Sequence, residues 1–83
     1  MTLREFVEQN GGFVRNVMDD MQHCSKTKNK INEPDKWHEN LEVLYNDYYI
    51  LLGYIKAACE YGHISHKESL SLEDELQLIL TEK

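Results

Sequence analysis

The chain has few of the residues that would give it covalent cross-links or membrane anchoring. Its 83 residues include only two cysteines, Cys24 and Cys59, and one proline. Two thiols do not make the disulfide framework of a small secreted domain, so we expect them to be free or metal-bound. Apolar stretches last only a few residues, whereas a helix that spans a bilayer needs about 20. We therefore predict no membrane segment.

An export signal is also missing from the first residues. Arg4, Glu5 and Glu8 stand where a signal peptide would need its apolar region. We therefore expect a cytoplasmic protein. A chain of this length has room for one core, so we predict a single helical domain over residues 1–83.

Basic residues are scarce as well. Nine lysines and arginines face fifteen acidic residues, which gives a formal charge of −6. Such a charge repels a polyphosphate backbone and disfavours direct binding to nucleic acid. The lysines gather in SKTKNKINEPDK, where no aromatic residue or arginine is interleaved to stack on bases or read their edges. Residues 25–33 are therefore predicted to form a solvated polar loop.

What the chain does have is one long amphipathic helix. Asn32-Glu33-Pro34 opens it and Gly62 closes it, because proline suits the first helical turn and glycine suits the left-handed residue past the end. Its apolar residues recur at helical spacing and need a partner surface along the whole rod. They are Trp37, Leu41, Leu44, Tyr45, Tyr48, Leu51, Leu52, Ile55 and Cys59.

A helix is predicted before this one. Thr2 and Glu5 form a capping box at its start. Gly11-Gly12 lies within it, and each glycine disfavours the helix by about 1 kcal/mol relative to alanine, so we expect a bend or a break there. Its apolar stripe comprises Leu3, Phe6, Val7, Phe13, Val14, Val17, Met18 and Met21.

A third helix follows Gly62. Ser65 and Glu68 form its capping box, and its stripe runs from Leu72 to Leu80. No stretch alternates as a strand would. With short connections, the expected fold is all-α, a compact antiparallel three-helix bundle.

Two groups of metal-ligand residues lie at opposite poles of this predicted bundle. Cys59, His63 and His66 surround the end of the long helix, and thiolate with imidazole is a donor set that zinc accepts. At the alternative pole are His23, Cys24 and His38. Each group offers three ligands, where a closed structural zinc site has four. The other interpretation is that Cys59 packs as a small hydrophobe and the histidines lie at the surface.

Catalytic signals are absent from the sequence. There is no glycine-rich phosphate loop and no nucleophile motif. A thiol enzyme needs a thiolate paired with a positioned histidine in a concave pocket, and a three-helix chain of this size offers little concavity. We therefore predict that the protein is not an enzyme and has no catalytic residues.

Five tyrosines crowd into the long helix and its end. Tyr49 and Tyr54 are rotated away from the apolar stripe, on opposite flanks, and tyrosine is enriched in binding hot spots. We predict a partner-binding surface on one of these flanks, either where Glu42 accompanies Tyr49 or where Asp47 accompanies Tyr54. Ordinary partial burial against the other helices is the competing interpretation.

In size, acidity and lack of motifs the chain resembles the small proteins of phages and other mobile elements, including anti-CRISPR proteins that occupy a Cas effector. The one distinctive stretch is CEYGHISHKESL. The resemblance implies an inhibitor whose acidic surface docks on a basic, nucleic-acid-handling protein. A zinc-stabilised accessory protein and a homo-oligomeric structural bundle are the alternatives, and the oligomeric state stays open.

Overall fold

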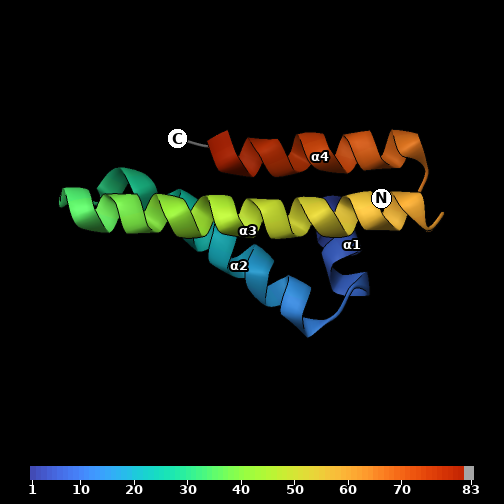
Figure 1. The fold of residues 1–83 in the computed structure, drawn as a ribbon, viewed down its shortest axis with the longest axis horizontal. Coiled ribbons are helices and arrows are strands. Elements are labelled where there is room, and N and C mark those ends of the chain that lie inside the picture. Colours follow the sequence, from blue (N-terminus) through green and yellow to red (C-terminus); the bar gives the residue numbers. More distant parts are fainter. Residues whose placement is uncertain (82–83) are drawn as a thin grey trace.

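The computed structural model describes residues 1–81, and its regular elements are all helical (Figure 1). They are α1 (Leu3–Gln9), α2 (Gly12–Thr27), the 3-10 turn η1 (Lys28–Lys30), α3 (Pro34–Glu60) and α4 (His66–Thr81). The predicted all-α class is confirmed. The predicted count of three helices is wrong, because four α-helices are present over these residues. None of them is both long enough and apolar enough to cross a membrane.

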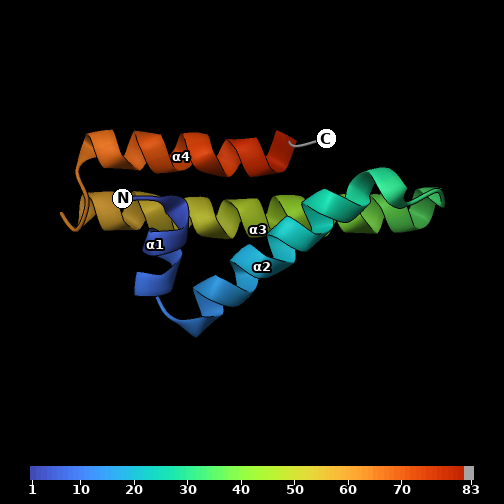
Figure 2. The ribbon, with the colours of Figure 1, turned by 180° about the vertical axis from the view of Figure 1, so that it is seen from behind.

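The extra helix results from a break at the glycine pair. Gly11 has a φ of +96°, a conformation that side chains disfavour, and it separates α1 from α2. Before the break, the predicted capping box is present, since the Thr2 hydroxyl accepts from Glu5 N–H and the Glu5 carboxylate accepts from Thr2 N–H. Figures 1 and 2 show α1 and α2 diverging from this turn.

The long helix α3 forms the axis of an elongated molecule of 44 × 22 × 17 Å. Pro34 occupies its first turn, and Gly62, with a φ of +78°, ends it as predicted. His63 N–H donates to the carbonyl of Ala58 and Gly62 N–H to that of Cys59, which is the Schellman arrangement. The chain then reverses into α4, which lies antiparallel beside α3, while α2 crosses α3 obliquely on another side (Figures 1 and 2).

The core lies where α2, α3 and α4 meet, with α1 closing one end. Three aromatic residues predicted on the apolar stripes are instead exposed: Phe13, Trp37 and Tyr45. Phe13 lies in the first turn of α2, one residue before the buried Val14 and therefore about 100° around the helix from it. The buried apolar residues are Leu3, Phe6, Val7, Val14, Val17, Met18, Met21, Cys24, Leu44, Leu51, Ile55, Ala58, Ile64, Leu72 and Leu76.

The segment predicted as a polar loop over residues 25–33 is largely helical. α2 continues to Thr27 and η1 follows. Ser25 is buried, and its hydroxyl donates to the carbonyl of Ile79 at 2.5 Å. The Lys28 ammonium donates to the carbonyl of Leu80 at 2.9 Å. These bonds to the last turn of α4 satisfy carbonyls that have no partner inside the helix, which is why a polar segment is ordered here.

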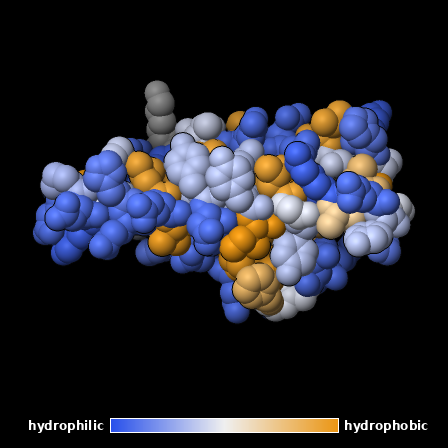
Figure 3. Space-filling model, viewed as in Figure 1, coloured by the Kyte–Doolittle hydropathy of each residue, from blue (hydrophilic) through white to orange (hydrophobic). Residues whose placement is uncertain are grey.

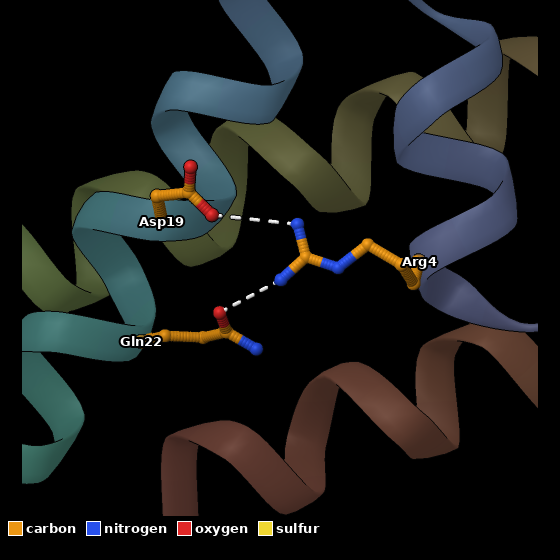
Figure 4. Close-up of polar contacts among 3 residues, drawn as sticks. All are labelled: Arg4, Asp19 and Gln22. Atoms are coloured by element: carbon orange, nitrogen blue, oxygen red, sulfur yellow. Dashed lines mark hydrogen bonds and ion pairs between the residues drawn. The ribbon is translucent and has the colours of Figure 1, made fainter.

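Polar contacts also fix α1. Arg4 reaches across to α2, where its guanidinium donates to Asp19 at 3.3 Å and to Gln22 at 2.9 Å (Figure 4). Leu3 N–H donates to the Glu75 carboxylate of α4 at 3.1 Å. The short helix is thereby tied to both of its neighbours.

The Ser65 capping box gives a test of how α4 begins. The Ser65 hydroxyl accepts from Glu68 N–H at 3.0 Å. Ser65→Ala should lower the free energy of unfolding by about 1 kcal/mol, because one N–H at the helix start loses its partner. Urea unfolding followed by circular dichroism measures this. Ser71→Ala, at an exposed position inside α4, is the matched control and should leave stability unchanged or slightly raised; equal losses in both variants would contradict the cap.

Candidate partner-binding face

Two of the predicted binding residues lie together on the outer side of α3. Tyr49 is 64% exposed and Tyr54 is 38% exposed. They border a shallow depression lined also by Ile50, Gly53 and Ala57. With Phe13 of α2, which is 60% exposed, they make a largely apolar surface. We call it the aromatic face, and it consists of Phe13, Tyr49, Ile50, Gly53, Tyr54 and Ala57.

The rings of this face support one another. The centroids of Phe13 and Tyr54 lie 6.5 Å apart with the planes tilted by 48°. Tyr49 meets the half-buried Tyr48 edge-on, with centroids 5.3 Å apart. Both spacings lie within the range of favourable aromatic pairs. In Figure 3, apolar and pale side chains gather over the middle of α3 and the beginning of α2.

Acidic residues continue the same side of α3 toward its N-terminus. Asp35, Glu39 and Glu42 are exposed, and Glu60 stands beyond the other end of the aromatic face. Figure 3 shows this N-terminal part of α3 as strongly hydrophilic. The structure therefore places Glu42 on the surface with Tyr49, as the sequence predicted. An apolar patch next to like charges is suited to a partner that is both apolar and basic.

Asp47 does not belong to this surface, and its predicted exposure beside Tyr54 is wrong. It is only 6% exposed, because α2 covers that flank of α3. The sequence held the signal, since Asp47 falls three residues after Leu44 and four before Leu51, on the same stripe as the core. Its Oδ2 atom is buried, and no hydrogen-bond donor among residues 1–81 reaches it.

The chemistry around Asp47 favours a shared proton. Burial raises the pKa of Asp47 to about 7, and the neighbouring Asp20 carboxyl adds to this through a hydrogen bond and through its charge. Two carboxyls can hydrogen-bond only if one carries a proton, so protonation supplies the donor that the ionised pair lacks. Asp47 is therefore part of the α2–α3 packing rather than a contact for a partner.

The predicted zinc site at the end of α3 is not assembled. Cys59 and His66 line one depression between α3 and α4, together with Lys56, whereas His63 lines another beside Phe6 of α1. The Schellman turn produces this separation, because it directs the chain away from α3 directly after Gly62. Within residues 1–81, no three side chains of His, Cys, Asp or Glu are placed to hold a metal ion.

The alternative zinc pole fails for a different reason. His23 and His38 are exposed, whereas Cys24 is buried against the core. Burial raises the pKa of the Cys24 thiol, and the charges of Asp20 and Asp47 raise it further. A metal binds the thiolate, so this environment opposes coordination. The carbonyl of Cys24 is instead bound by the Asn40 amide of α3 at 2.9 Å.

Four members of the aromatic face, Phe13, Ile50, Gly53 and Ala57, were not among the predicted binding residues. Phe13 was expected in the core, and only the break at Gly11 turns it toward Tyr54. Gly53 lies in the interior of α3, and its position between Tyr49 and Tyr54 in the sequence could have indicated that it belongs to the binding surface. An interior glycine weakens a helix by about 1 kcal/mol relative to alanine, so helix stability does not explain why glycine is present at this position.

The carboxyl pair predicts a stability that falls as pH rises. The pKa of Asp47 is about 7 in the folded chain, whereas the ordinary pKa of an aspartate, which applies to the unfolded chain, is 3.8. Between these values the folded state binds more protons, so the free energy of unfolding decreases with rising pH. Asp47→Asn stays neutral and its amide can donate to Asp20. It should remove much of this decrease and raise stability at about pH 8 by roughly 1–3 kcal/mol.

Urea unfolding at intervals between about pH 4 and about pH 8 checks this expectation. Asp74→Asn is the matched control, because Asp74 is exposed on α4. It should keep the pH dependence of the parent chain. Parallel curves for Asp47→Asn and the parent would show that the pair holds no proton in this range.

Comparison with protein-family models, with curated proteins and with solved structures found no match to this chain. The functional case therefore depends on the chain's own surface. That surface offers an aromatic face of six residues with acidic side chains at both of its ends along α3.

Proposed function

We propose that this chain is a small acidic protein-binding module that regulates or inhibits a basic, nucleic-acid-handling protein in the cytoplasm. The observation that carries the proposal is the aromatic face, where Tyr49, Tyr54 and Phe13 leave large rings at the surface of a charged domain. Such rings bury much area on binding while tyrosine keeps a hydrogen-bonding tip.

Charge supports the same proposal. The net charge of −6 attracts a basic partner from within about a Debye length, roughly 8 Å at physiological salt. It also repels nucleic acid, so the module would compete for a basic surface rather than bind the polymer itself. Acidic residues such as Glu42 would speed association, and the rings would prolong the complex.

The resemblance to anti-CRISPR proteins suggests one specific partner class. A Cas effector presents a positively charged channel that holds nucleic acid through its backbone. An acidic domain with an apolar face is suited to occupy such a channel or its rim. Inhibition would then follow from exclusion of the nucleic acid, with no chemical step at this chain.

Aromatic substitutions test the proposal. Tyr49→Ala or Tyr54→Ala should each weaken binding to the partner by about 1 kcal/mol or more, with the loss mainly in the dissociation rate. Melting should change little for Tyr49, which is mostly exposed. Affinity capture from the native host identifies the partner, and surface plasmon resonance measures its binding.

The matched control is Tyr61→Ala, at a tyrosine that is 78% exposed but outside the aromatic face. It should bind the partner as the parent does. If Tyr61→Ala weakens binding while Tyr49→Ala and Tyr54→Ala do not, the partner uses the α3–α4 turn and the proposed surface is wrong.

Charge reversal tests the approach step. Glu42→Lys should lower the association rate several-fold and reduce its dependence on salt, while the dissociation rate changes less. Stopped-flow or surface plasmon resonance at several salt concentrations measures both rates. Asp74→Lys makes the same change of charge on exposed α4, away from the aromatic face. An equal effect of the two variants would mean that net charge alone, and not this face, guides the partner.

A further inference from the structure

Within residues 1–81, one side of α3 is not covered by another helix. α4 lies beside α3 and α2 crosses behind it, so the side that faces the viewer in Figure 1 is uncovered. This is the side that carries the aromatic face. Its residues follow one line along the helix in steps of three or four: Asp35, Glu39, Glu42, Asn46, Tyr49, Gly53, Ala57 and Glu60.

Gly53 lies in the middle of this line and is not required by the chain's own packing. A Cβ atom added there would meet nothing within 4 Å. Its φ is not positive, so the backbone does not require glycine either. Alanine would strengthen the helix by about 1 kcal/mol. The absent side chain instead leaves room for another backbone to approach α3 closely.

The surroundings of Gly53 have the shape of a shallow groove. Two small residues, Gly53 and Ala57, line a depression of about 360 Å³ together with the larger Tyr49, Ile50 and Tyr54. Small residues bordered by large rings are suited to the rounded surface of a helix. The residues of this line also recur every three or four positions, which is the spacing at which two helices pack along their length.

Charge along the same line specifies the occupant further. The N-terminal half presents Asp35, Glu39 and Glu42, all exposed, and the C-terminal half presents the aromatic face. A helix lying along both halves needs cationic side chains at one end and apolar side chains at the other. From Asp35 to Ala57 this line of residues extends about 33 Å at roughly 1.5 Å per residue, which a helix of about 20 residues matches.

We propose that the uncovered side of α3, from Asp35 to Ala57, binds a basic amphipathic helix of a partner protein. The inference rests on the proposed function and specifies which part of a basic partner is recognised. Apolar side chains of that helix fill the groove over Gly53, and its lysines or arginines lie against Glu39 and Glu42. A second copy of this chain fits less well, because the acidic residues along its own α3 would repel Glu39 and Glu42.

Synthetic peptides test the inference without the natural partner. Each is a helix-forming peptide of about 20 residues with a fluorescent label, carrying lysines at helical spacing in one half and leucines in the other. Both orders of the halves are made. A scrambled peptide of identical composition lacks the one-sided pattern. We expect one patterned peptide to bind at least about tenfold more tightly than the scrambled one in fluorescence anisotropy.

Variants at Gly53 locate the binding site. Gly53→Leu fills the groove and should weaken binding of the patterned peptide by about tenfold or more, whereas Gly53→Ala should keep it within about threefold and raise the melting temperature. Because the position is open, both variants should fold, which circular dichroism verifies. The double variant Glu39→Lys, Glu42→Lys should also lose binding of the patterned peptide.

Several results would overturn the inference. Equal binding of patterned and scrambled peptides would show unspecific charge attraction, and unchanged binding by Gly53→Leu would place the peptide elsewhere. A dimer of the protein that Gly53→Leu dissociates in analytical ultracentrifugation would make a second copy the occupant. If the natural partner depends on Tyr49 and Tyr54 but no peptide binds selectively, the proposed function stands and the helical occupant is wrong. If a peptide binds selectively but Tyr49→Ala and Tyr54→Ala leave binding of the natural partner unchanged, α3 has a site for a basic helix and the proposed function is wrong.

Discussion

The structure depends on how α3 distributes its surface. In proteins most helix stability comes from the packing of an amphipathic face rather than from propensity, so α3, with 27 residues, depends on apolar contacts along its length. Leu44, Leu51 and Ile55 provide them as buried members of the core, and the partly buried Leu41, Tyr48 and Leu52 also pack against the core. Two sides of α3 are thereby covered by α2 and α4. The third side of α3 carries the aromatic face and the exposed acidic residues of its N-terminal half.

The break at Gly11 determines which residues reach that surface. With one continuous first helix, Phe13 would follow the apolar stripe into the core. The positive φ of Gly11 redirects the chain, so that α2 crosses α3 and Phe13 meets Tyr54 at the edge of the crossing. α1 is then held back against the bundle by Arg4 and by the bond from Leu3 N–H to Glu75. A feature that weakens a helix thus builds part of the candidate site.

Asp47 shows that this core is not wholly apolar. A buried carboxyl whose Oδ2 has no donor favours its neutral form, since an ionised group at this depth would lose its hydration without compensation. Asp20, on the neighbouring helix, adds a like charge to the same place. The packing of α2 on α3 therefore contains one buried carboxyl with a raised pKa, that of Asp47, which is not part of the aromatic face.

The helical class, both capping boxes, the limits of α3 and the surface positions of Tyr49 and Glu42 could be predicted from the amino-acid sequence, because caps, proline, glycine and helical periodicity act within a few residues. The other features depend on how the helices pack against one another. Whether Gly11-Gly12 bends or breaks depends on packing, the burial of Asp47 and Ser25 depends on which helix crosses there, and the separation of His63 from Cys59 and His66 depends on the path of the turn. Spacing places residues on a helix, but only the neighbouring helices decide which of them meet.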